Sequence, residues 1–123
     1  MLDELVARIP SAEELLAFSP SQLDGVLLVC IAGRANSTDP IAAKYVYEDE
    51  IVGLYPVGVK ATYEQRIAID SVLMEAWQRL LQSGLIMQAP GQAPRMMTLT
   101  ERGRDAVGSV KFEEIVVRQD AAR

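Results

Sequence analysis

The alternation of apolar and polar residues predicts helices over most of the chain. Between Pro20 and about Ala32, apolar residues recur at i, i+3, i+4, i+7 and i+8, which is the spacing of a helix with one face toward a core. Gly33 is expected to end this helix. A longer helix is predicted from Tyr63 to Ser83, followed by a left-handed cap at Gly84. The buried residues predicted for the two helices are Leu23, Val26, Leu27, Cys30 and Ile31, and Ile69, Val72, Leu73, Ala76, Trp77, Leu80 and Leu81.

Short polar signals mark where several helices begin. Each of three pairs places a hydroxyl residue three positions before Glu or Gln, which is the pattern of a capping box: Ser11 and Glu14, Ser19 and Gln22, and Thr62 and Gln65. Two short helices are therefore expected before Pro20. One runs from Leu2 to Ile9 and is closed by Pro10, and the other runs from Ala12 to Phe18.

The pattern weakens between Arg34 and Lys60. Asp39 and Pro40 predict the start of one short helix, IAAKYVY, and the breakers after it predict a long loop. Within that loop, GLYPVGVK resembles the GxxxxGK[ST] phosphate loop only superficially. Val59 comes before the lysine, and Ala61 stands where the motif needs a hydroxyl. We interpret the segment as a loop that enters the long helix.

The C-terminal third predicts a hairpin and a last helix. LIMQA and RMMTL are strand candidates on either side of PGQAP, and Thr100 precedes the helix ERGRDAVGS, which Gly103 and Gly108 weaken. The tail, residues 110–123, fits a strand or a helix equally well.

The predicted fold class is mainly α with a small antiparallel β-hairpin. At 123 residues and half apolar, the chain is expected to form one domain, with residues 1–18 as a helical extension.

Composition excludes several classes of protein. With a single cysteine, Cys30, the chain cannot form an intrachain disulfide, which fits a protein of the reducing cytoplasm. The Cys30 side chain is expected to be buried. No apolar run is long enough for a membrane helix, and the acidic N-terminus does not resemble a signal peptide. With no histidine and one cysteine, the usual nucleophilic triads and zinc sites are excluded. Adjacent carboxylates such as Glu113 and Glu114 are interpreted as solvated. We therefore expect neither catalysis nor a cofactor or metal.

Two resemblances suggest a more specific fold. AWQRLLQSGLI, a Pro/Gly tip and MTLTERGRDAV resemble the recognition-helix and wing region of winged helix-turn-helix proteins of the MarR and PadR type. IPSAEELLAFSPSQLDGVLL together with MEAWQRLLQSGLI is similar to the N-terminal region of an uncharacterised bacterial family sometimes called Ymh-type. Both resemblances imply a winged-helix fold, and the second brings no established activity.

The charge distribution gives this implied fold a candidate surface. The whole chain has a net charge of −5, yet Ala76–Lys111 has five basic residues against Glu101 and Asp105. A winged helix would place its long helix in the major groove of DNA and its wing near the phosphates. The residues expected to contact DNA are Lys60, Tyr63, Arg66, Ser71, Gln78, Arg95, Arg102 and Arg104. Asp70 and Glu75 lie on or near the same helix face and disfavour binding, because they repel phosphate.

These features are compatible with two functions. The first is a cytoplasmic DNA-binding domain that acts as a regulator or recruits other proteins to DNA. The alternative is a protein-interaction module that uses the same fold without binding DNA. Its acidic N-terminal half and the apolar segments LDELVARI and FEEIVV favour it, because such segments can complete a partner's core. A homodimer is compatible with both functions.

Overall fold

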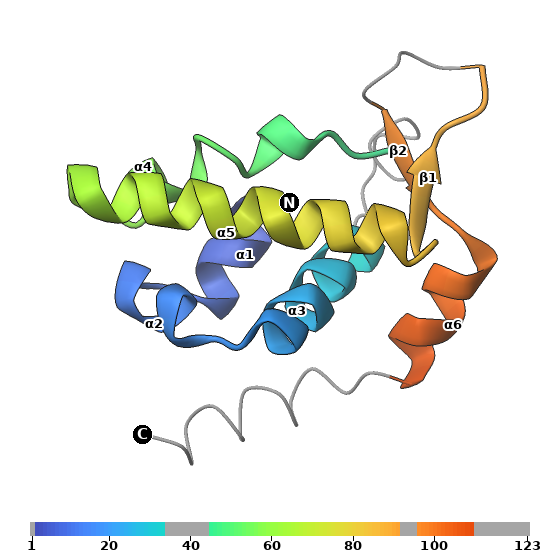
Figure 1. Cartoon of the computed structure of the whole chain (residues 1–123), viewed down its shortest axis with the longest axis horizontal. Coiled ribbons are helices and arrows are strands. Elements are labelled where there is room, and N and C mark those ends of the chain that lie inside the picture. Colours follow the sequence, from blue (N-terminus) through green and yellow to red (C-terminus); the bar gives the residue numbers. More distant parts are fainter. Residues whose placement is uncertain (1, 34–44, 92–95, 110–123) are drawn as a thin grey trace.

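The computed structural model describes residues 2–33, 45–91 and 96–109, and over these ranges the chain is mainly helical with one antiparallel hairpin (Figure 1). The predicted fold class is thereby confirmed, and the order of elements is compatible with a winged helix. The elements are the helices α1 (Leu2–Arg8), α2 (Ala12–Ala17), α3 (Pro20–Gly33), α4 (Tyr55–Gly58), α5 (Tyr63–Gln82) and α6 (Glu101–Ser109), the 3-10 helix η2 (Glu48–Glu50), and the strands β1 (Ile86–Gln88) and β2 (Met97–Leu99).

Two of the predicted capping boxes form with both of their hydrogen bonds. At the start of α5, the Gln65 amide donates to the Thr62 hydroxyl at 3.3 Å, and the Thr62 amide donates to the Gln65 side chain at 2.9 Å. Ser19 and Gln22 pair in the same way at the start of α3. At α2, the Ser11 hydroxyl accepts from the Glu14 amide at 3.2 Å. These bonds satisfy amide groups that the first turn of a helix leaves without an intrahelical partner.

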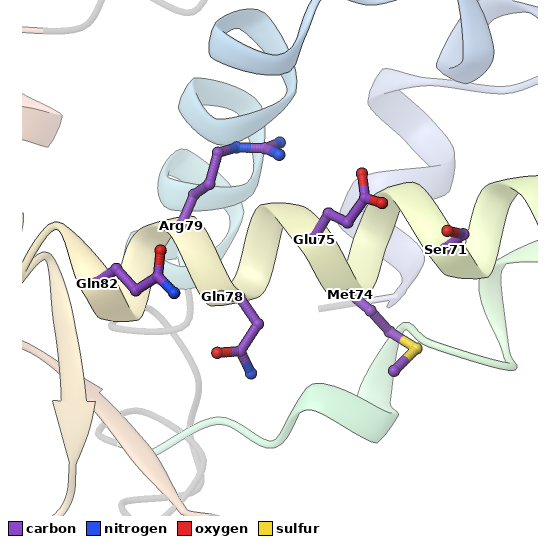
Figure 2. A pocket seen from close by; sticks show the side chains of 6 residues that line it. All are labelled: Ser71, Met74, Glu75, Gln78, Arg79 and Gln82. Atoms are coloured by element: carbon purple, nitrogen blue, oxygen red, sulfur yellow. The ribbon is translucent and has the colours of Figure 1, made fainter.

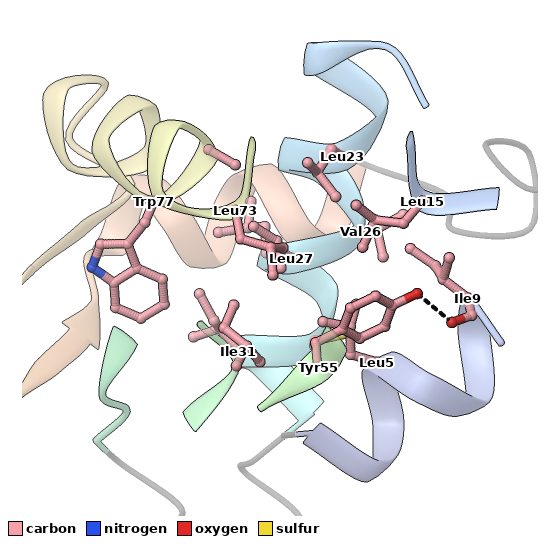
Figure 3. Packing of buried hydrophobic residues seen from close by; sticks show 14 of the residues in the cluster. Leu5, Ile9, Leu15, Leu23, Val26, Leu27, Ile31, Tyr55, Leu73 and Trp77 are labelled. Atoms are coloured by element: carbon pink, nitrogen blue, oxygen red, sulfur yellow. Dashed lines mark hydrogen bonds between the residues drawn. The ribbon is translucent and has the colours of Figure 1, made fainter. Parts of the chain in front are cut away.

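The core lies where α3 and α5 cross, with α1, α2 and α4 packed around them (Figure 3). All five residues of the predicted apolar stripe on α3, Cys30 among them, are buried, as is Trp77, which confirms their predicted positions. Leu28 is buried as well, although it lies outside the stripe. It is covered because α3 contacts α1 and α6 in addition to α5.

The predicted N-terminal extension is part of this core. Leu5, Ile9 and Leu15 are almost fully buried, and the Tyr55 hydroxyl donates to the Ile9 carbonyl at 2.7 Å (Figure 3). That carbonyl follows the last turn of α1, where helix carbonyls need a partner from outside the helix. Leu5 and Ile9 of the segment LDELVARI thus pack within their own chain. The second apolar segment, FEEIVV, lies outside the described residues.

The segment predicted as a long loop contains more structure than expected. Both η2 and α4 lie within it, and Tyr55 of α4 is buried. The start of the predicted helix IAAKYVY lies outside the described residues, and its end is extended rather than helical, because Val46 pairs with Met97. Two hydrogen bonds of 2.9 Å join their backbones and form an isolated bridge beside the two-stranded hairpin.

The hairpin and α6 form as predicted. β1 pairs with β2 in antiparallel register, with Ile86 opposite Leu99, and Gly84 adopts the expected positive φ of 72°. The Thr100 hydroxyl accepts from the Gly103 amide at 2.9 Å and so caps α6. It also donates to the Gly84 carbonyl, which connects the cap of α6 to the end of α5.

Candidate functional site

The outward face of α5 carries four of the eight residues that the sequence assigned to function, and Lys60 lies just before this helix. The helix has 20 residues and is therefore about 30 Å long. Lys60, Tyr63 and Arg66 are exposed at its start, and Ser71 and Gln78 are exposed farther along it. Their predicted exposure is confirmed, while their contact with DNA stays a prediction.

Arg102 and Arg104 lie at the opposite end of the helix. α6 follows the hairpin beside the C-terminal end of α5, whereas Lys60 precedes its N-terminal end (Figure 1). Arg102 and Arg104 are exposed on α6, and Arg104 donates through Nη1 to the Leu99 carbonyl at 3.2 Å. Arg95 lies outside the described residues. The basic residues thus form two groups at the two ends of α5.

Apolar side chains lie between these groups. On the outward face of α5, Tyr63 is 76% exposed, Ile67 58% and Met74 47%. The spacing of four and then seven residues places the three in one row along the helix. Neither Ile67 nor Met74 was among the functional residues predicted from the sequence. The signal was present, since the helix pattern assigned neither of them to the buried face.

The exposed charged residues on this face balance. Glu64 and Glu75 are exposed, against Lys60 and Arg66. Asp70 was expected to face outward as well, but it is only half-exposed, and its Oδ1 accepts from the Gly53 amide at 2.8 Å. Gly53 has a φ of 85°, a backbone conformation that favours glycine. Asp70 therefore holds the turn before α4 against α5, a structural role that the sequence did not indicate.

Arg79, one of the five basic residues counted in Ala76–Lys111, is also held by a residue of another element. Its Nε and Nη2 bind the Asp24 carboxylate of α3 at 2.9 and 2.8 Å. This pair of hydrogen bonds raises the pKa of Arg79 above its ordinary value. The ion pair connects α3 to α5 and cancels the positive charge of Arg79 on this side of the helix.

Two depressions meet at this ion pair. The larger is an open hollow of about 480 Å³ along the second half of α5, between Ser71 and Gln82, and it is shown in Figure 2. The smaller, of about 60 Å³, lies where α2 and the start of α3 meet α5. Glu75 and Arg79 line both depressions, so the two lie next to each other along α5, and we refer to them together as the groove.

The described residues contain no group of three or more potential metal ligands. Among the helices that the structure describes, none is both long and apolar enough to cross a membrane. GLYPVGVK does not form a phosphate loop, because Tyr55–Gly58 is helical. Comparisons with protein-family models, with curated proteins and with solved structures found no match.

Proposed function

We propose that the chain is a non-catalytic protein-binding module that presents the outward face of α5 to a partner. The observation that carries this proposal is the exposed apolar row of Tyr63, Ile67 and Met74 in the middle of the candidate surface. Covering apolar surface is favourable by about 25 cal/mol per Å², and aromatic and methionine residues are enriched in protein interfaces. DNA phosphates, in contrast, would be repelled by Glu64 and Glu75.

The test compares two methionines of similar exposure. Ile67→Asp and Met74→Asp place charge in the proposed interface, whereas Met87→Asp alters a methionine on β1 that is 42% exposed. Each variant, with its fold checked by circular dichroism, is used to capture partners from an extract of the cells that encode it. A captured protein is then purified and titrated by calorimetry. We expect binding to survive Met87→Asp and to be lost in the α5 variants. Equal binding by all variants would place the interface elsewhere, and light scattering would show whether the partner is a second copy.

DNA binding is a second candidate, favoured by the exposure of Lys60, Tyr63 and Arg66 at the start of α5. A hairpin follows that helix, as in winged-helix proteins that bind DNA. If DNA is bound, fluorescence anisotropy with random duplex will show affinity falling steeply between about 50 and 200 mM salt, because bound phosphates release counterions. Arg66→Ala, Arg95→Ala and Arg102→Ala would each weaken binding. No binding at the lower salt concentration would exclude this function.

A further inference from the structure

The groove beside α5 has an apolar end. The smaller depression is lined by Leu16, Phe18 and Val72, of which Leu16 is 39% exposed and the other two are half-buried. Its volume of about 60 Å³ equals the share of roughly two water molecules in liquid water. This space suits the end of one apolar side chain rather than a small-molecule ligand.

The charges around the groove are acidic. Arg79 is paired with Asp24, so Asp24 and Glu75 together place two carboxylates against one guanidinium at the groove. Glu64 lies eleven residues before Glu75, so both project from the same side of α5 about 16 Å apart. Glu13 of α2 faces the same side, because its Oε1 accepts from the Gln65 side chain at 3.4 Å.

These features select one kind of occupant. We infer that the groove between α2 and α5 binds a partner segment in which a bulky apolar side chain is flanked by lysine or arginine. The apolar side chain enters the depression at Leu16, Phe18 and Val72, and the basic residues lie against Glu75 and the neighbouring carboxylates. This inference rests on the proposed function and specifies the chemistry of the partner.

A second copy of the chain fits this surface less well. Two α5 helices packed antiparallel about a twofold axis near Ser71, with Ile67 opposite Met74, would bring Glu64 of one copy near Glu75 of the other. Like charges at such a contact are unfavourable. An acidic segment would be repelled for the same reason.

Selection from random peptides tests the inference. Phage-displayed 12-residue peptides are selected on the full chain, and the binders are measured by fluorescence anisotropy. We expect the selected peptides to combine one large apolar residue with Lys or Arg. Their affinity should fall about tenfold or more with Glu75→Lys and with Leu16→Asp. Asp3→Lys, which reverses an exposed charge on α1, should leave the affinity unchanged.

The other outcomes are distinguishable. The inference would be overturned if the selected peptides lack basic residues, keep their affinity for the Glu75→Lys variant and no longer bind the Ile67→Asp variant. The proposed function would then still stand. Selection of no peptide above an unrelated helical protein would also overturn the inference, and the capture experiment would still decide the proposed function. A dimer broken by Leu16→Asp would assign the groove to a second copy. Competition by a synthetic peptide of residues 110–123 would assign it to the chain's own tail.

Discussion

Gly103 is expected to stabilise the folded protein, although glycine has a low intrinsic helix propensity. A Cβ atom at this position would lie against the Leu85 carbonyl oxygen and 3.1 Å from the Leu99 side chain. The sequence identified this glycine as a weak point of α6, but it is what lets the helix approach the start of the hairpin. Gly103→Ala is therefore expected to destabilise the protein by about 1–3 kcal/mol, even though alanine favours an exposed helix by about 1 kcal/mol. Urea unfolding measures the difference.

The neighbouring Arg102 provides the control for this substitution. Its side chain is exposed on the same helix, so Arg102→Ala is expected to change the free energy of unfolding by less than about 0.5 kcal/mol. A Gly103→Ala variant that is as stable as the wild type, or more stable, would show that α6 does not depend on this close approach.

Cys30 provides a second prediction, which concerns pH. Burial raises the pKa of its thiol from 9.0 to about 12, and the charge of Glu4 adds to the shift. Because the thiolate is the nucleophile, iodoacetamide at pH 8 should modify the folded protein much more slowly than the protein in urea. Equal rates in the two states would show that Cys30 is accessible.

The same pKa shift has a consequence for stability. The folded state holds the thiol proton more tightly than the unfolded state, so this contribution is complete below pH 9 and is lost as the pH rises toward about 12. The free energy of unfolding should decline over that interval, and the decline should be smaller in Cys30→Ala. An equal decline in both proteins would assign the effect to other groups, of which Tyr55 is one, because burial raises its pKa as well.

At the scale of single residues, the sequence predicted which residues of a helix are buried better than it predicted contacts between residues far apart in the chain. Cys30 and Trp77 were correctly placed in the core, because helical spacing alone determines which face they share. Asp70 and Arg79 were placed on the surface, yet each has a partner 17 or 55 residues away in the chain. Charged residues on a helix give no local sign of such a partner, so their positions required the structure.

Among the elements, α5 is expected to be stabilised by the capping box at its N-terminus, which Thr62 and Gln65 form. Thr62→Ala removes the hydroxyl that accepts from the Gln65 amide, and we expect the free energy of unfolding to fall by about 1 kcal/mol. Thermal unfolding followed by circular dichroism is the measurement. Ser71→Ala serves as the matched control, because Ser71 is exposed within α5. Equal unfolding temperatures for the two variants would mean that the cap contributes little.

Element boundaries were predictable where the signals are local. The boundaries of α3, α5 and α6 lie within one residue of their predicted positions, since caps and glycines mark them. The extended segment at Val46 was not predictable, because its hydrogen bonds go to Met97 in a distant part of the chain. For the same reason, the sequence predicted the hairpin but not the bridge that joins Val46 to it.

For the molecule as a whole, the sequence predicted the fold class, and it did not determine the function. Helices and a hairpin follow from periodicity and turn residues, whereas function depends on which charges remain exposed after packing. Packing removed Asp70 and Arg79 from the outward face of α5 and left Ile67 and Met74 exposed on it. For this surface we propose a protein partner first and DNA second, which reverses the order in which the sequence suggested them.

The shared core leads to a last prediction, which concerns cooperativity. Residues of α1, α2, α3, α4 and α5 belong to one buried cluster, so these elements should unfold together. Trp77 is the only tryptophan and is 2% exposed, and its fluorescence therefore reports on the core, while far-UV circular dichroism reports on all helices. We expect both signals to change at the same urea concentration. If the circular dichroism signal decreases first, then some helices separate before the core opens, and the N-terminal helices would form a less stable unit despite burying Leu5 and Ile9.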